Sequence, residues 1–130
     1  MTIYSDLENK YQLLDYNITH SQLLIRSVKN KNRAYNIDIL FKPASLMLIP
    51  AVFYGIEITL CDSDEVIGYL VEKYGFKVGK DYKVFSIKSM NDNVFYINAM
   101  AVYVFHNELG QSESSMNGLE SCFGEKIVSY

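Results

Sequence analysis

The chain has 130 residues, of which 49% are hydrophobic and 21% are charged, and its net charge is −3 at pH 7. This length and composition are typical of one soluble globular domain, and the mild acidity gives no support to nucleic-acid binding, which needs a basic field. The N-terminus carries no basic and apolar leader, and no uncharged run is long enough to span a bilayer. We therefore expect a cytoplasmic protein with neither a membrane nor a nucleic-acid partner.

Alternation of apolar and polar residues predicts several strands before residue 62. Two of them, Gln22–Val28 and Ala34–Phe41, flank a polar turn and so predict a β-hairpin with one face on the core. Further strands are predicted at Tyr11–Ile18, Leu46–Ile49 and Ile56–Cys61.

The stretch from Asp62 to Gly75 predicts one amphipathic helix. Asp62 is the expected N-cap, Glu65 would complete a capping box, and Gly75 suits a left-handed C-cap. At about 100° per residue, the apolar arc that should be buried contains Val66, Ile67, Leu70, Val71 and Tyr74. The opposite arc contains Asp64, Glu65, Gly68, Tyr69, Glu72 and Lys73.

After the helix, Tyr82–Ser89 and Val94–Phe105 predict a second hairpin. The longer strand is apolar on both faces, which is typical of a central strand covered on both sides. Its alanines, Ala99 and Ala101, would leave room for the helix. The chain then becomes small and polar, and we expect a mobile segment at about residues 107–118. The C-terminal part predicts a helical turn at Leu119–Phe123 and a strand at Lys126–Tyr130.

Together these elements predict an α+β fold in a single domain, residues 1–130. We expect an antiparallel or mixed sheet of about five to seven strands. One principal helix, at about residues 63–74, should pack on that sheet.

No residue pattern in the chain demands a particular chemistry. Cys61 and Cys122 lie far apart without metal-ligand spacing, so we expect buried thiols rather than a disulfide, and no metal site. The glycines form no phosphate-binding loop, and the spacing of His20 and His106 implies no shared acid–base site. We therefore predict no catalytic residues and no cofactor.

The sequence LLIRSVKNKNRAYNIDILF, followed by a short apolar segment and GIEITLCD, covers about Ser21–Asp62. In texture this stretch resembles small bacterial immunity proteins of polymorphic or contact-dependent toxin systems. The resemblance implies a non-enzymatic module that binds and neutralises a cognate toxin domain. It carries over no functional residue, because such proteins bind through varied surfaces.

Two candidate sites follow from the pattern. The first is the polar arc of the helix, where three carboxylates surround an aromatic anchor that a basic toxin domain would contact: Asp64, Glu65, Tyr69 and Glu72. The alternative is a small enzyme or ligand-binding domain that uses a polar face of the first hairpin: Arg26, Asn36 and Asp38.

Overall fold

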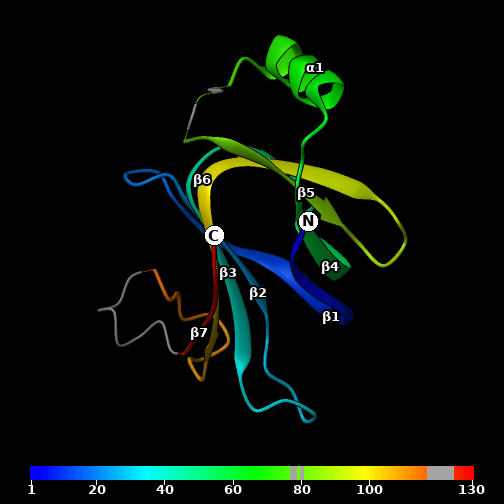
Figure 1. Ribbon diagram of the computed structural model, residues 1–130. Coiled ribbons are helices and arrows are strands. Elements are labelled where there is room, and N and C mark those ends of the chain that lie inside the picture. The colour runs from blue at the N-terminus through cyan, green and yellow to red at the C-terminus, as the bar shows by residue number, and fades with distance from the viewer. Residues whose placement is uncertain (77–78, 80, 117–124) are drawn as a thin grey trace.

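A computed structural model describes residues 1–76, 79, 81–116 and 125–130 of the chain. Within these residues it contains seven β-strands and one α-helix (Figure 1). In chain order they are β1 (Thr2–Asn17), β2 (Gln22–Ser27), β3 (Asn36–Leu48), β4 (Val52–Leu60), α1 (Asp64–Tyr74), β5 (Lys83–Lys88), β6 (Val94–Asn107) and β7 (Glu125–Ser129). The predicted α+β class, strand number and helix position are confirmed.

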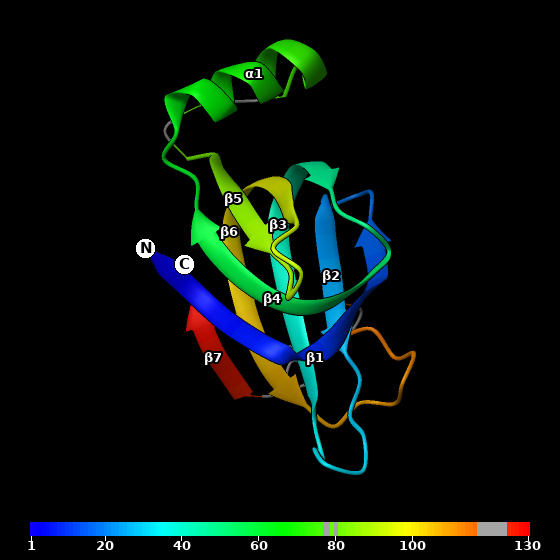
Figure 2. The ribbon, with the colours of Figure 1, turned by 90° about the vertical axis from the view of Figure 1, so that its right-hand side faces the viewer.

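All strand pairs are antiparallel, and the sheet closes on itself. The strand order is β3-β2-β1-β4-β5-β6-β7. An additional pairing between β3 and β6, the two outer strands of the run β3-β2-β1-β4-β5-β6, closes these six strands into a ring. Figure 2 shows the strands curving around a common interior, with α1 beyond one end of the sheet. The two predicted hairpins are present as β2–β3 and β5–β6.

The central strand is β6, as its two apolar faces predicted. One edge of β6 pairs with β3 along almost its whole length, from Asn36 opposite Asn107 to Leu48 opposite Tyr96. The other edge pairs first with β5 and then with β7. Since β6 contacts three strands, it is the element on which ring closure depends.

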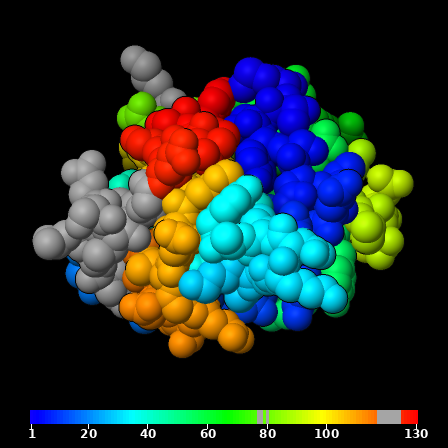
Figure 3. Space-filling view, turned by 90° about the horizontal axis from the view of Figure 1, so that it is seen from below, coloured from blue at the N-terminus to red at the C-terminus, as the bar shows by residue number. Residues whose placement is uncertain are grey.

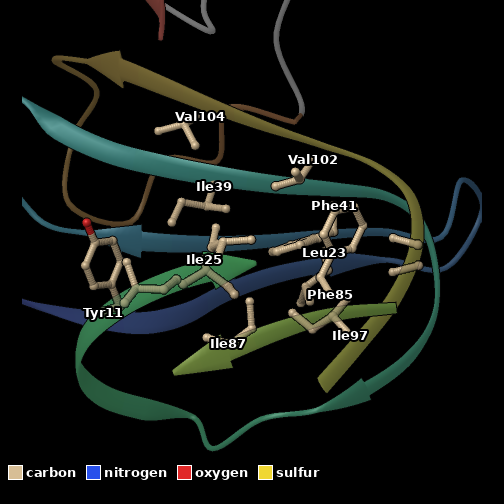
Figure 4. Packing of buried hydrophobic residues seen from close by; sticks show 14 of the residues in the cluster. Tyr11, Leu23, Ile25, Ile39, Phe41, Phe85, Ile87, Ile97, Val102 and Val104 are labelled. Carbon is tan, nitrogen blue, oxygen red and sulfur yellow. The ribbon is translucent and has the colours of Figure 1, made fainter. Parts of the chain in front are cut away.

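The core fills the interior of the closed sheet (Figure 4). Burial of each large apolar side chain there contributes roughly 1.5–3 kcal/mol. The fully buried side chains labelled in Figure 4 are Tyr11, Leu23, Ile25, Ile39, Phe41, Phe85, Ile87, Ile97, Val102 and Val104. A second, smaller cluster of Leu24, Leu40 and Phe105 lies on the outer face and packs against Leu14, Tyr103 and Met116.

The main difference from the prediction is β1, which begins at Thr2 rather than at Tyr11. A bulge explains the missed half: Asp6 lies opposite Ile56 and Lys10 opposite Tyr54, so β1 uses two more residues than β4 over this interval. The bulge breaks the period of two by which a strand is recognised. Similarly, the predicted strand at Leu46–Ile49 is the end of the long β3 and no separate element.

The alanines of β6 do not make room for the helix, so that prediction is wrong. Ala99 faces the core and is fully buried, whereas Ala101 is half-buried. Cys61 is a free thiol, but it is half-buried rather than buried. Cys122 and the predicted helical turn at Leu119–Phe123 lie outside the described residues.

Candidate functional site

Helix α1 is held by local capping at both ends. The side chain of Ser63 accepts a hydrogen bond from the backbone N–H of Val66 at 3.3 Å, and Gly75 ends the helix in the left-handed region (φ 64°). The prediction that Asp62 is the N-cap is wrong by one residue, because Ser63 has the extended backbone and the accepting side chain. The predicted C-cap is confirmed.

The helix lies beyond one end of the closed sheet rather than flat on a sheet face (Figures 1 and 2). Leu70 is the one described residue of α1 that is buried, and Val66, Ile67 and Val71 are half-buried. Tyr74, predicted to be buried, is 43% exposed. A ring of strands turns its apolar faces inward, so it offers the helix no broad face on which all five apolar side chains can be covered.

The outward surface of α1 is acidic and aromatic. Four predicted residues are all exposed there: Asp64, Glu65, Tyr69 and Glu72. Tyr69 is 58% exposed, so this residue is available for contact. We call these four residues together with Tyr74 the α1 surface.

Lys73 is the one cation on this helix, and it lies between the two tyrosines. Its Nζ is 3.2 Å from Tyr69 Oη and 5.5 Å from the ring centroids of both Tyr69 and Tyr74. The hydrogen bond with Tyr69 raises the pKa of Lys73 above its ordinary value. Lys73 therefore contacts both tyrosines, and the three exposed carboxylates of α1 outnumber its single positive charge.

Gly68, on the same side of α1, has no structural requirement of its own. A Cβ atom built there would have no neighbour within 4 Å outside the local helix backbone. A glycine in a helix interior costs about 1 kcal/mol relative to alanine. Nothing in the described part of the chain offsets this cost.

The alternative site residues do meet in the structure, as a buried ion pair. Arg26 and Asp38 lie directly opposite each other on β2 and β3, and both are fully buried. Arg26 Nε donates to Asp38 Oδ1 at 2.5 Å, and Nη2 donates to Oδ2 at 2.7 Å. This is the two-point geometry in which an arginine–carboxylate pair is strongest.

Two asparagines extend this pair into a network. Asn107 Nδ2 donates to Asp38 Oδ2 at 2.8 Å, and Asn36 Nδ2 donates to Asn107 Oδ1 at 3.0 Å. Sequence reasoning missed Asn107, although it is polar at the end of an apolar strand. Its importance comes from its place opposite Asn36 in the β3–β6 register.

The network holds the segment that follows β6 against the outer face of the sheet. Arg26 Nη1 donates to the carbonyl oxygens of Gly110 (3.0 Å) and Gln111 (3.3 Å), and Asn36 donates to that of Leu109 (2.9 Å). The alternative site residues are thus covered by their own chain, with their hydrogen bonds directed to protein groups. The mobility expected for residues 107–118 stays a prediction, and residues 117 and 118 lie outside the described part.

A second polar group lies in β1, where the bulge brings its side chains together. Tyr11 Oη donates to Asp6 Oδ2 at 2.6 Å, and Asn9 Nδ2 donates to the same oxygen at 2.8 Å. Burial raises the pKa of Asp6, but the hydrogen bonds from Tyr11, Asn9 and the backbone N–H of Glu8, together with the charge of Arg33, hold that pKa below its ordinary value. Figure 3, viewed from the end opposite α1, shows the cyan β2–β3 hairpin between β1 and the orange segment after β6.

Across the described ranges, no three His, Cys, Asp or Glu side chains come together as a metal site requires. No helix in the same ranges is long and apolar enough to cross a membrane. Comparisons of the chain with protein-family models, with curated proteins and with solved structures find no match. No relative therefore lends this chain a function, and the geometry of its own surfaces has to carry the proposal.

Proposed function

We propose that this chain is a non-enzymatic protein-binding module, most concretely an immunity protein that binds and neutralises a cognate bacterial toxin domain. The observation that carries the proposal is the position of α1, which lies beyond the closed sheet (Figures 1 and 2). The acidic and aromatic side chains of this helix are exposed. A helix that covers little of the core is free to cover part of a partner.

The chemistry of the α1 surface favours a basic partner. The helix carries three carboxylates and one ammonium group, so its surface is negative. A positive surface on the partner would complement it and speed the encounter of the two proteins. Tyr69 and Tyr74 add rigid rings, which are common anchors at interfaces and attract arginine side chains. A toxin domain that acts on nucleic acid needs a basic surface, and it would therefore suit this helix.

The test begins with a toxin domain encoded beside this gene, purified as an inactive variant. Binding is measured by calorimetry and its rates by surface plasmon resonance. Tyr69→Ala should weaken the complex by about 1 kcal/mol or more, as loss of an interface anchor does. Glu65→Lys combined with Glu72→Lys should chiefly slow association, and the effect should grow at low salt.

A matched control separates the site from net charge. Glu8→Lys combined with Glu108→Lys makes the same charge change at two exposed positions away from α1. This control should slow association much less than the α1 pair. Unchanged affinity and an unchanged association rate in the variants at Tyr69, Glu65 and Glu72 would place the interface elsewhere. The absence of any complex with the neighbouring toxin would overturn the immunity function.

A further inference from the structure

A hollow of about 460 Å³ opens beside β2, β3, β5 and β6, and none of the residues found to line it belongs to α1. Its size falls within the range of small-molecule sites in proteins. The residues that line it are His20, Gln22, Lys42, Pro43, Asp81, Lys83, Met100, Ala101 and Tyr103. Two lysines and a histidine thus gather around one hollow in a chain whose net charge is −3.

The hollow lies where the buried residues of β3 and β6 both depart from strict alternation. The inward residues of β3 pass from Phe41 to Ala44, and those of β6 pass from Ala99 to Val102, so each strand carries one extra residue. Lys42 lies opposite Ala101 at this break. The small side chain of Ala101 leaves space that a larger residue would fill.

Both lysines are held in place without a neutralising carboxylate. Lys83 Nζ donates to the carbonyl oxygen of Met100 at 2.8 Å, and Lys42 Nζ lies 5.1 Å from the ring centroid of Tyr103. Within the described part of the chain, neither ammonium group has a carboxylate at ion-pair distance. Each ammonium has three N–H donors, and Lys83 uses one of them on Met100, so donors remain for a ligand.

We propose that this hollow binds a small phosphate-bearing molecule, with the phosphoryl group held between Lys42 and Lys83. Two ammonium groups act as point charges and suit a phosphoryl group, whose oxygens accept several charge-assisted hydrogen bonds. The ligand is small, because a nucleic-acid strand needs a longer basic track than two lysines supply. Among the described residues of the lining, Asp81 is the one carboxylate, and it opposes an anion.

The test is a titration of the intact chain, followed through backbone amide signals by NMR at low salt. The probes are pyrophosphate, ADP and adenosine. Pyrophosphate and ADP should shift the amide signals of Lys42, Ala101 and Tyr103 saturably, whereas adenosine should not. Tighter binding of ADP than of pyrophosphate would assign the ligand to the nucleotides, and equal binding would assign recognition to the phosphoryl groups alone.

Variants then test which residues hold the anion. Lys42→Gln should weaken pyrophosphate binding about tenfold, since it removes one of two charges without removing a structural hydrogen bond. Asp81→Asn should tighten binding, and Lys31→Gln, at an exposed position in the β2–β3 turn, should leave it unchanged. Failure of pyrophosphate to cause saturable shifts, or equal binding to the Lys42→Gln protein, would overturn the proposal. Neither result bears on the α1 surface.

Discussion

Removal of the Asp38 carboxylate should be among the most destabilising single changes in this chain. Asp38→Ala leaves the Arg26 guanidinium fully buried, with Nε and Nη2 deprived of acceptors 2.5 and 2.7 Å away. The Asn107 amide loses its acceptor as well. Breaking a buried ion pair from one side costs about 3–5 kcal/mol, because it leaves an uncompensated charge buried.

The loss of stability in Asp38→Ala depends on the unpaired charge of Arg26 that remains buried, and not on the strength of the ion pair. Arg26→Met combined with Asp38→Leu removes both charges, and a buried pair replaced by apolar side chains of similar size is often nearly neutral. We therefore expect the double variant to be more stable than Asp38→Ala alone. Lys88→Ala is the control, because it breaks an ion pair at the surface. The Lys88 side chain is 45% exposed and its Nζ lies 3.8 Å from Glu57 Oε2. Surface pairs of this kind contribute about 0–1 kcal/mol.

The assay is urea unfolding followed by far-UV circular dichroism, with one slope fitted to all variants. The expected order of stability is wild type and Lys88→Ala, then the double variant, then Asp38→Ala. A loss for Asp38→Ala no larger than that for Lys88→Ala would refute the reasoning. In that case water would reach the guanidinium, and the segment after β6 would not seal the outer face.

Three further predictions concern single positions in β1, β4 and α1. Gly68→Ala should raise the free energy of unfolding by about 1 kcal/mol, measured by urea unfolding, because the added methyl group meets no neighbour and the helix gains propensity. Gly55→Ala should lower it by about 1–2 kcal/mol or more, since Gly55 has φ 76° and its Cβ would lie 3.0 Å from Met90 Cβ. Tyr11→Phe removes a hydrogen bond that, against burial, lowers the pKa of Asp6. A carboxyl group whose pKa is lowered by folding stabilises the fold at pH values above its unfolded pKa. This stabilisation is lost as the pH falls through the folded pKa. The urea midpoint of Tyr11→Phe should therefore drop at neutral pH and approach that of the wild type in acid.

The parts of the fold that follow a regular period were predictable. Strands β2, β5 and β6 alternate or are continuously apolar, and Gly75 marks the end of α1 without ambiguity. The first half of β1 was not predictable, because its bulge interrupts the period. Closure of the sheet was not predictable either, because the β3–β6 pairing joins residues such as Asn36 and Asn107 that have no local signal for each other.

The candidate site shows the same division between local and long-range information. Helical periodicity was enough to predict that Asp64, Glu65, Tyr69 and Glu72 are exposed together. The exposure of Tyr74 depends instead on how much of the helix the sheet covers, which is set by closure of the ring. Likewise, polar positions in an apolar hairpin predicted that Arg26, Asn36 and Asp38 share one polar face, but not that the segment after β6 would cover it.

Closure of the sheet also decides how α1 is attached, and Leu70 tests that attachment. The strands bury their apolar faces against one another, whereas α1 has one buried side chain, Leu70, which is 4% exposed. Truncation of a buried leucine costs about 2–5 kcal/mol where the surroundings cannot relax. Because α1 lies outside the ring, we expect Leu70→Ala to release the helix locally and leave the sheet folded.

Hydrogen exchange distinguishes local release from global unfolding. In Leu70→Ala, amide protection should fall in α1, by about tenfold for each 1.4 kcal/mol lost, while β6 amides keep the protection of the wild type. An equal fall in β6 would mean that α1 unfolds together with the sheet and is part of its cooperative core. A helix that can be released by itself can change its outward residues with little effect on the fold, and a recognition surface that must match a particular partner needs that freedom.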